Sequence, residues 1–395
     1  MLLKVIQNKL SHILYVILFC INTIYLCIII LVVNMPKLNK ILRITLLFVI
    51  IFTITGCNTS YKNLNDIAIV SSFLVKTEGD DYKVYIELYK EEKSENKSKK
   101  VSYFVNGTGS NLREAINDAS NSVSKTLYFN HINAVIFSKD AIDNNLDYMF
   151  NYLEKRIQVN SNYYILIADD IIELMESKDE DNPILGEKIK YLIDNSTNNG
   201  AMIDYDYLEK LSNFISKNRD IYLSKINVKD KNITIENGYY FQDEKIVGEL
   251  NNDGIKLCNL FRDSENIYFT FEFDEGYYVL KIDSSDFKFN FDDGINLNLK
   301  IKANIDSAAS NINLKDVNVI NKLNAHSSAS IERRLNELIE KLKNDKSDIM
   351  AINDYIYKYC GYKKYDFFKD KTNVKVDLVI NKKGLVNNTI GGEHE

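Results

Sequence analysis

The sequence predicts an α/β fold in the first half of the chain and an α+β fold in the second half, with mixed sheets packed by helices. Strand and helix patterns alternate between residues 66 and 176, the order typical of α/β domains. After residue 226, strands come first, two helices follow and one strand closes the region. A polar stretch over residues 179–205 separates the two patterns, so we place the domain boundary near residues 195–220.

The first strands alternate between apolar and polar residues. Residues 82–89, YKVYIELY, place apolar side chains on one face. The charged run KEEKSENKSKK predicts a solvated hairpin loop, and VSYFV predicts the returning strand. Gly107 and Gly109 are expected to end that strand, and Asn111 to cap a helix with Glu114 at the capping-box position. The buried stripe of this helix consists of Leu112, Ala115, Ile116, Ala119 and Val123.

The next segments are expected to form the centre of the first sheet. HINAVIF predicts a strand that His131 opens, and residues 141–156 and 171–176 predict helices. YYILIA is continuously apolar, so we expect a central strand that is covered on both faces. The ring of His131 is expected to bond backbone or to pack, and a role as a general base is the alternative.

The second half begins with a hairpin over residues 238–250, with its turn at Asp243 and Glu244. IYFTFEF alternates, and INLNLKIKANI places apolar residues on one side and Asn and Lys on the other, which predicts a sheet with one wet face. His326 lies in a Ser- and Ala-rich stretch that we interpret as a turn. Two helices follow, the second capped by Ser347, and NVKVDLVI predicts the closing strand.

Residues 1–56 have the features of a signal region. A basic segment and the apolar residues 44–54 precede Ile-Thr-Gly-Cys, which resembles a bacterial lipobox. We expect cleavage between Gly56 and Cys57, with a diacylglycerol on the Cys57 thiol. An uncleaved anchor and a chance cysteine are the alternatives. A second apolar run over residues 13–33 is long enough to span a bilayer, but the signal is complete without it, so Met35 is the expected start.

Composition excludes several classes of function. Cleavage removes five Lys and Arg and no acids, which leaves 44 basic and 55 acidic residues and a net charge of −11. Nucleic-acid binding and electrostatic adhesion to anionic lipid both need basic clusters, so neither is expected. Two cysteines remain besides Cys57, and we interpret Cys258 and Cys360 as separate buried thiols, with a disulfide as the alternative.

The sequence shows no motif typical of a catalytic, metal or nucleotide site. The four histidines lack zinc-ligand spacing, and no catalytic or nucleotide-binding motif occurs. Residues 179–181 are acidic but lack the spacing of a calcium loop. GTGSN before the first helix favours a turn and cap over an anion site, and Arg333 and Arg334 favour a charged helix face. We therefore expect no metal and no cofactor apart from the covalent lipid.

Four stretches together resemble the Ger(x)C family, the lipoprotein C subunits of spore germinant receptors. They are the lipobox followed by an apolar first strand, the block GTGSNLREAINDASNSVSKTLYFNHINAVIFSKDAI, the segment KRIQVNSNYYILIADDIIELM, and the closing DIMAINDYIYKY and VKVDLVINKKGLV. The chain departs from the family pattern at Asn58, Thr59 and Asn130, and near Asp306, which indicates a divergent receptor class whose germinant is not carried over.

The resemblance implies three domains, a lipid anchor on the outer face of the spore inner membrane, and assembly with integral-membrane A and B subunits. It implies a non-catalytic role in assembly or signalling during nutrient-triggered germination. We expect an N-terminal domain over residues 57–195, a connecting segment over 196–225 and a C-terminal region over 226–395, with possible subdomains at 226–290 and 291–395. A lipid-anchored solute-binding protein and an extracytoplasmic enzyme are the alternative functions.

Overall fold

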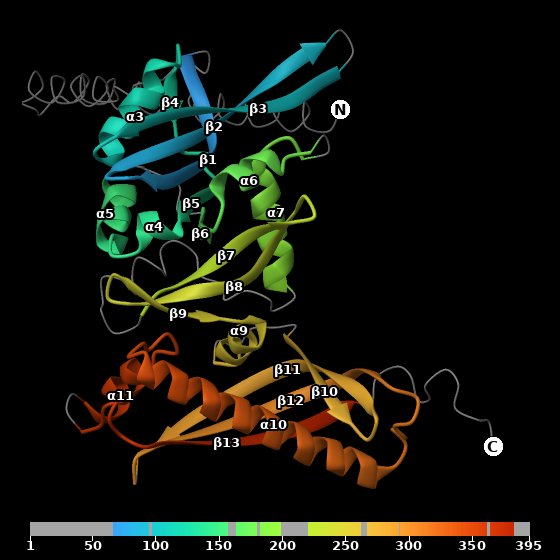
Figure 1. Ribbon diagram of the computed structural model, residues 1–395. Helices are drawn as coiled ribbons and strands as arrows, with labels where there is room; N and C mark the ends of the chain where they lie inside the picture. The colour runs from blue at the N-terminus through green and yellow to red at the C-terminus, as the bar shows by residue number, and fades with distance from the viewer. Residues whose placement is uncertain are drawn as a thin grey trace, which may run out of the picture. The chain divides into compact units, whose positions relative to one another are not determined.

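The computed structural model describes residues 66–94, 97–156, 163–179, 182–198, 220–261, 267–291, 293–361 and 364–382 (Figure 1). Within these ranges the strands form two mixed sheets, one of nine strands and one of four. No helix within them is both long enough and apolar enough to cross a bilayer. The predicted combination of mixed sheets and packed helices is confirmed.

The first sheet has a parallel centre and antiparallel ends. Its order is β3-β2-β1-β5-β6-β7-β8-β9, and β4 pairs with β1. β1 is parallel to β4 and β5, β5 is parallel to β6, and β6 is parallel to β7. The strands are β1 Ile67–Glu78, β2 Asp81–Ser94, β3 Lys97–Gly109, β4 Thr126–Tyr128, β5 Ala134–Ser138, β6 Tyr164–Ala168, β7 Tyr222–Lys229, β8 Asn232–Gln242 and β9 Lys245–Leu250.

Helices cover both faces of this sheet. One core contains residues of α3, α4 and α5, and a second core on the opposite face contains residues of α6 and α7. β6 contributes to both cores, which confirms the central strand predicted from YYILIA. The helix predicted over residues 141–156 is divided in two, because Asn144 has a left-handed φ of 62°. The helices are α3 Leu112–Asn121, α4 Lys139–Ile142, α5 Leu146–Arg156, α6 Ile171–Glu176 and α7 Leu185–Asn198.

Of the two glycines expected to end β3, Gly109 is its last residue, whereas the strand continues through Gly107. They let α3 lie directly on the strand. A Cβ atom at Gly107 would overlap the Ala115 carbonyl oxygen and the Ala119 backbone nitrogen, and one at Gly109 would lie 2.6 Å from the Ala115 nitrogen. The predicted cap is confirmed, since the Asn111 side chain accepts the N–H of Glu114 at 3.0 Å. The Glu114 carboxylate bonds Ser110 in return.

β7, β8 and β9 extend the first sheet, although the sequence analysis grouped most of these residues with the second half. The hairpin predicted over residues 238–250 is formed by β8 and β9. The change of sheet falls between Leu250 and Ile267, where α9, Asn252–Asn259, lies. The expected domain ranges stay a prediction, since strand pairing defines a sheet and does not delimit an independently folding unit.

The second sheet has one covered face and one wet face. Its order is β10-β11-β12-β13, and β13 is parallel to β12. Buried and exposed residues alternate along β12, which confirms the predicted pattern. The helix α10 lies across the covered face (Figure 1). The elements are β10 Ile267–Phe273, β11 Gly276–Asn290, β12 Ile295–Ala308, α10 Val317–Asn344, α11 Ile352–Cys360 and β13 Thr372–Lys382.

The stretch around His326 is helical, so its interpretation as a turn is wrong. α10 runs through it because its serines make bonds to the sheet. The buried Ser327 hydroxyl lies 2.7 Å from the Tyr278 hydroxyl, and the Ser328 hydroxyl accepts the N–H of Leu378 at 3.0 Å. The Tyr278 hydroxyl also lies 2.9 Å from Nδ1 of His326. Burial raises the pKa of Tyr278 to about 12.

The cap predicted for α11 is also wrong. Ser347 donates instead to the carbonyl of Phe241 in β8, at 2.9 Å. The Asp348 carboxylate caps the helix by accepting the N–H groups of Ile352 at 2.8 Å and Asn353 at 2.7 Å. A serine that looked like a local cap therefore links the second half of the chain to the first sheet.

We predict that Gly107→Ala lowers the free energy of unfolding by about 1–3 kcal/mol, because the added methyl group would push α3 away from β3. Asn106→Ala is the matched control, since Asn106 precedes the glycine in β3 and is exposed. Urea denaturation followed by circular dichroism measures both. Equal stability of the two variants would contradict the close approach of α3 to β3.

Candidate functional site

A carboxylate is completely buried in the first sheet. Glu87 lies in the middle of β2 and is 0% exposed. Its oxygens accept four hydrogen bonds, from the hydroxyls of Ser72 (2.9 Å) and Ser102 (2.7 Å) and from the backbone N–H groups of Leu185 (2.7 Å) and Gly186 (2.9 Å). A buried carboxylate is tolerated only when it is bonded in this way.

The donors come from elements that are far apart in the sequence. Ser72 is in β1, Ser102 in β3, and the two N–H groups belong to the first turn of α7, which has no intrahelical partners for them. The negative charge also faces the positive end of the helix dipole. A Cβ atom at Gly186 would overlap the Ser71 carbonyl oxygen, so glycine allows the helix end to reach the sheet. Glu87 therefore fixes α7 to three strands.

Lys178 extends this network. Its ammonium group donates to the Ser102 hydroxyl at 3.0 Å and lies 4.6 Å from the centre of the Phe104 ring. Burial lowers the pKa of Lys178, and the nearby Glu87 charge opposes that shift. A serine beside a lysine of lowered pKa is also the arrangement of a nucleophile and its base. Here, however, the Ser102 hydroxyl lies 2.7 Å from Glu87 and 2.6 Å from the Pro183 carbonyl, so its proton is already committed to a fixed acceptor.

A second polar cluster links the two sheets. The Asp220 carboxylate accepts the N–H of Asp348 at 2.5 Å, and the hydroxyl of Tyr240 in β8 bonds the carboxylate of Asp345, which follows α10. The Lys341 ammonium donates to the carbonyl of Glu249 in β9 at 2.6 Å. Burial raises the pKa of Asp220, and the charge of Asp243 adds to the shift. The cluster thus joins β8 and β9 to the helices of the second sheet.

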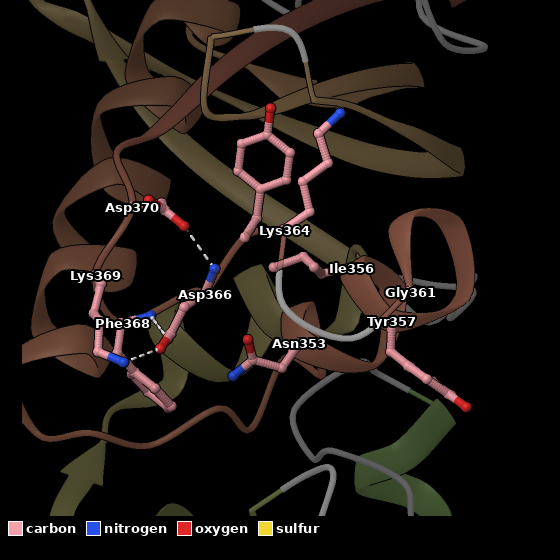
Figure 2. Close-up of a pocket in the computed structure, with 10 residues that line it drawn as sticks. Asn353, Ile356, Tyr357, Gly361, Lys364, Asp366, Phe368, Lys369 and Asp370 are labelled. Carbon is pink, nitrogen blue, oxygen red and sulfur yellow. Dashed lines mark hydrogen bonds and ion pairs between the residues drawn. The ribbon is translucent and has the colours of Figure 1, made fainter.

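Two hollows lie on the second half of the described chain. One, of ≈ 660 Å³, lies between α11 and residues 364–370 (Figure 2). Its carboxylates serve the fold of this loop: Asp370 accepts the N–H of Asp366 at 2.6 Å, and Asp366 pairs with Lys369 at 2.7 Å. The hydrogen bond from Lys369 lowers the pKa of Asp366. Figure 2 shows Lys364 extending away from both carboxylates.

The other hollow, of ≈ 450 Å³, lies between α9 and α10. Its cations already have partners within the chain. Arg333 pairs with Glu337 at 3.0 Å, Arg334 lies 3.6 Å from Asp253, and Lys341 bonds a backbone carbonyl. The charged face predicted around Arg333 and Arg334 is therefore present. Neither hollow collects the convergent unpaired groups typical of an active site.

The structure places the remaining predicted residues as follows. Gly56 and Cys57 lie outside the described residues, so cleavage and lipidation stay predictions. Neither Cys258 nor Cys360 is in a disulfide; Cys258 is buried, whereas Cys360 is partly exposed, so only the first is buried as expected. Among the described residues no group of His, Cys, Asp or Glu could hold a metal ion.

Of the two contacts expected for the His131 ring, packing is present, whereas a bond to backbone is not found in the described chain. The residue is exposed and lies in a turn before β5, and its ring contacts Tyr128 with the ring centres 5.9 Å apart. No hydrogen bond within the described chain involves this ring, so the expected bond to backbone is absent. The turn is closed instead by main-chain bonds, from Ile132 to Phe129 at 3.0 Å and from Asn133 to Ser71 at 2.8 Å.

Sequence analysis did not identify Glu87 or Asp220. Glu87 occupies a polar position of an alternating strand, where a solvated side chain is the normal expectation. Only the cover supplied by α7, about a hundred residues later, makes the position buried. Asp220 precedes β7 and carries no local pattern. Neither residue could have been found without the tertiary contacts.

These features define a multidomain α/β protein whose buried polar groups join elements of the fold. The family model described as "spore germination protein N-terminal domain" matches residues 60–228. The model described as "spore germination B3/GerAC like, C-terminal" matches residues 236–384. The two matches follow one another over most of the chain, so the protein belongs to the Ger(x)C family of spore germination proteins.

A crystal structure of the GerBC protein is similar in fold, with a TM-score of 0.50 and 14% sequence identity. The match covers 78% of this chain and 96% of the GerBC chain. No curated protein sequence matches the chain significantly. Family membership implies a receptor complex and points to the spore membrane, and this is not a known enzyme family.

We predict that Glu87→Ala lowers the free energy of unfolding by about 3–5 kcal/mol, because it leaves the Ser72 hydroxyl and two helix N–H groups without their acceptor. Glu87→Gln retains one acceptor oxygen and should lose less. Glu78→Gln is the control, since that exposed glutamate makes only surface ion pairs and should change stability by about 0–1 kcal/mol. A wild-type stability for Glu87→Ala would contradict the assigned role.

We predict that Asp220→Asn raises the melting temperature at pH 7. The pKa of Asp220 in the folded protein lies above the usual value of an aspartate. Ionisation of Asp220 therefore lowers the stability of the fold once the pH rises above the pKa of the carboxyl in the unfolded chain, about 4. Asn cannot ionise but can still accept the N–H of Asp348. The gain should shrink as pH falls toward 4, whereas the control Glu236→Gln, an exposed acid of β8, should show no such trend. Thermal melts across this pH range test the sign.

Proposed function

We propose that the protein is the lipid-anchored C subunit of a spore germinant receptor and acts without catalysis in assembly or signalling. The observation that carries the proposal is the ordered match of both halves of the chain to spore germination families. The lipobox-like segment ending at Cys57 precedes the first match by a few residues. That spacing suits a protein whose folded part begins just outside a membrane.

The proposed anchor limits where the folded region works. Ile67, the first residue of β1, lies ten residues after Cys57. Ten extended residues reach at most about 35 Å, so β1 would begin within that distance of the bilayer surface. A diacylglycerol group buries two acyl chains, which is enough for stable attachment. The acidic balance of the mature chain makes the lipid, rather than surface charge, the proposed means of retention.

A non-catalytic role agrees with the polar chemistry described above. Glu87 and Asp220 have their partners within the fold, and the charged groups of the two hollows are largely paired. The proposed partners are integral-membrane A and B subunits on the outer face of the spore inner membrane. A solute-binding protein is disfavoured because its two lobes would be similar, whereas the two sheets here differ in size and strand order.

The proposal predicts that spores without this chain lose a nutrient response that the wild-type gene restores. Cys57→Ala should fold but fail to restore the response, because the chain is no longer retained at the membrane. Germination is followed as the fall in optical density of spore suspensions across a nutrient panel. Cys57→Ser keeps a side chain of nearly the same size and should fail equally, because its hydroxyl is not the lipid acceptor.

Mass spectrometry of the wild-type protein extracted from membranes tests the anchor separately and should find a diacylated N-terminal Cys57. An intact Thr55-Gly56-Cys57 peptide as the main species would exclude processing. Unchanged germination without the gene, over the whole panel, would refute the receptor function.

A further inference from the structure

Three of the four outer sheet edges in the described chain receive hydrogen bonds from side chains of other elements. At β13, the N–H groups of Val376, Leu378 and Ile380 donate to Glu332, Ser328 and Asn324 of α10, at 3.0, 3.0 and 2.9 Å. The spacings match: four helical residues advance about 6.0 Å and two strand residues about 6.6 Å. This edge cannot add another strand without losing α10.

The two edges of the first sheet receive fewer bonds of this kind. At β9, the N–H of Ile246 donates to Asp143 at 2.9 Å, and the carbonyl of Glu249 accepts from Lys341 at 2.6 Å. At β3, the N–H of Thr108 donates to Asp118 of α3 at 3.0 Å. Natural sheets protect their edges by such devices, because unpaired backbone groups bind other strands.

The fourth edge, β10, has no such protection in the described chain. Its backbone pairs with β11 on one side, and no side chain of the described residues bonds it on the other. The strand IYFTFEF alternates regularly, with apolar residues on the covered face and Tyr268, Thr270 and Glu272 on the other face. It carries one charge and no Lys or Pro, so it lacks the usual means of rejecting a partner strand.

We propose that β10 pairs with β10 of a second copy of this chain, so that the two small sheets become one continuous antiparallel sheet. A two-fold axis through Thr270 places Thr270 opposite its own copy. Glu272 then faces Tyr268 of the second copy, so no like charges meet. On the covered face Phe269 meets Phe271 of the second copy, and Ile267 meets Phe273. In this register the strand is self-complementary in charge and in the placement of its apolar residues.

Pairing through one strand of seven residues buries much less than the ~1,200 Å² of a standard interface. The dimer is therefore weak and concentration-dependent, and it forms best where copies are crowded on one membrane. Cross-linking, which traps the associated state, is accordingly a better assay than sedimentation. The crowding rests on the proposed lipid anchor, but strand pairing itself does not depend on a role in germination, so failure of one proposal can be told from failure of the other.

The test uses the full-length chain in membranes, with cysteine introduced by Thr270→Cys. Directly opposed Cβ atoms lie about 4.5–5.5 Å apart, and disulfides form with modest adjustment from that distance. Mild oxidation should give a disulfide-linked dimer on a non-reducing gel, several-fold above Lys300→Cys. Lys300 is exposed on β12, two strands in from the β10 edge, and serves as the matched control. The unaltered chain controls for the native thiols.

A second pair of variants separates pairing from folding. Thr270→Lys opposes two lysines across the axis, whereas the matched Thr270→Val places no charge there. Chemical cross-linking of Thr270→Val should equal wild type and that of Thr270→Lys should be lost, with unchanged melting temperatures because Thr270 is exposed. Cross-linking of Thr270→Cys no stronger than Lys300→Cys would overturn the proposal. If the wild type does not self-associate, and Thr270→Lys instead loses a cross-link to a different membrane protein, the edge belongs to that partner.

Discussion

The buried charge of Glu87 is the constraint on which the first sheet depends. A carboxylate without water must be bonded on every side, and the four donors come from β1, β3 and the first turn of α7. Their positions are therefore coupled. If α7 moved, Glu87 would lose two donors and the helix would lose its cap. The glycine at 186 follows from this need for close approach, since a Cβ atom there would overlap the Ser71 carbonyl oxygen.

The same logic links the halves of the chain. The bonds from Tyr240 to Asp345, from Ser347 to the Phe241 carbonyl and from Lys341 to the Glu249 carbonyl all run between β8 or β9 and the region around the end of α10. Polar groups rather than apolar surface alone thus set the register between these elements. Asp220 also lies among these elements, and its pKa is raised because burial disfavours the charged carboxylate.

For a receptor subunit, such a framework offers stiffness and surface rather than chemistry. The described titratable clusters hold elements together, and the open surfaces are the wet face of the second sheet and the edge of β10. A lipid at Cys57 would keep these surfaces close to membrane partners. On the proposed pairing, assembly depends on which sheet edges the fold protects and on the β10 edge that it leaves available.

Sequence alone determined the elements whose burial is local and periodic. β6 follows from its continuous apolar run, β12 from alternation, the hairpin of β8 and β9 from its turn, and α3 from its cap and stripe. It also determined the family, because the lipobox and the block around GTGSN are contiguous motifs. Only the tertiary structure decided the fate of residues whose partners are distant. Gly107 continues a strand on which α3 lies, Ser327 is buried in a helix where its hydroxyl meets that of Tyr278, and Glu87 is buried because α7 covers it. Burial and hydrogen bonding of a polar residue depend on what packs above it and not on its neighbours in the chain.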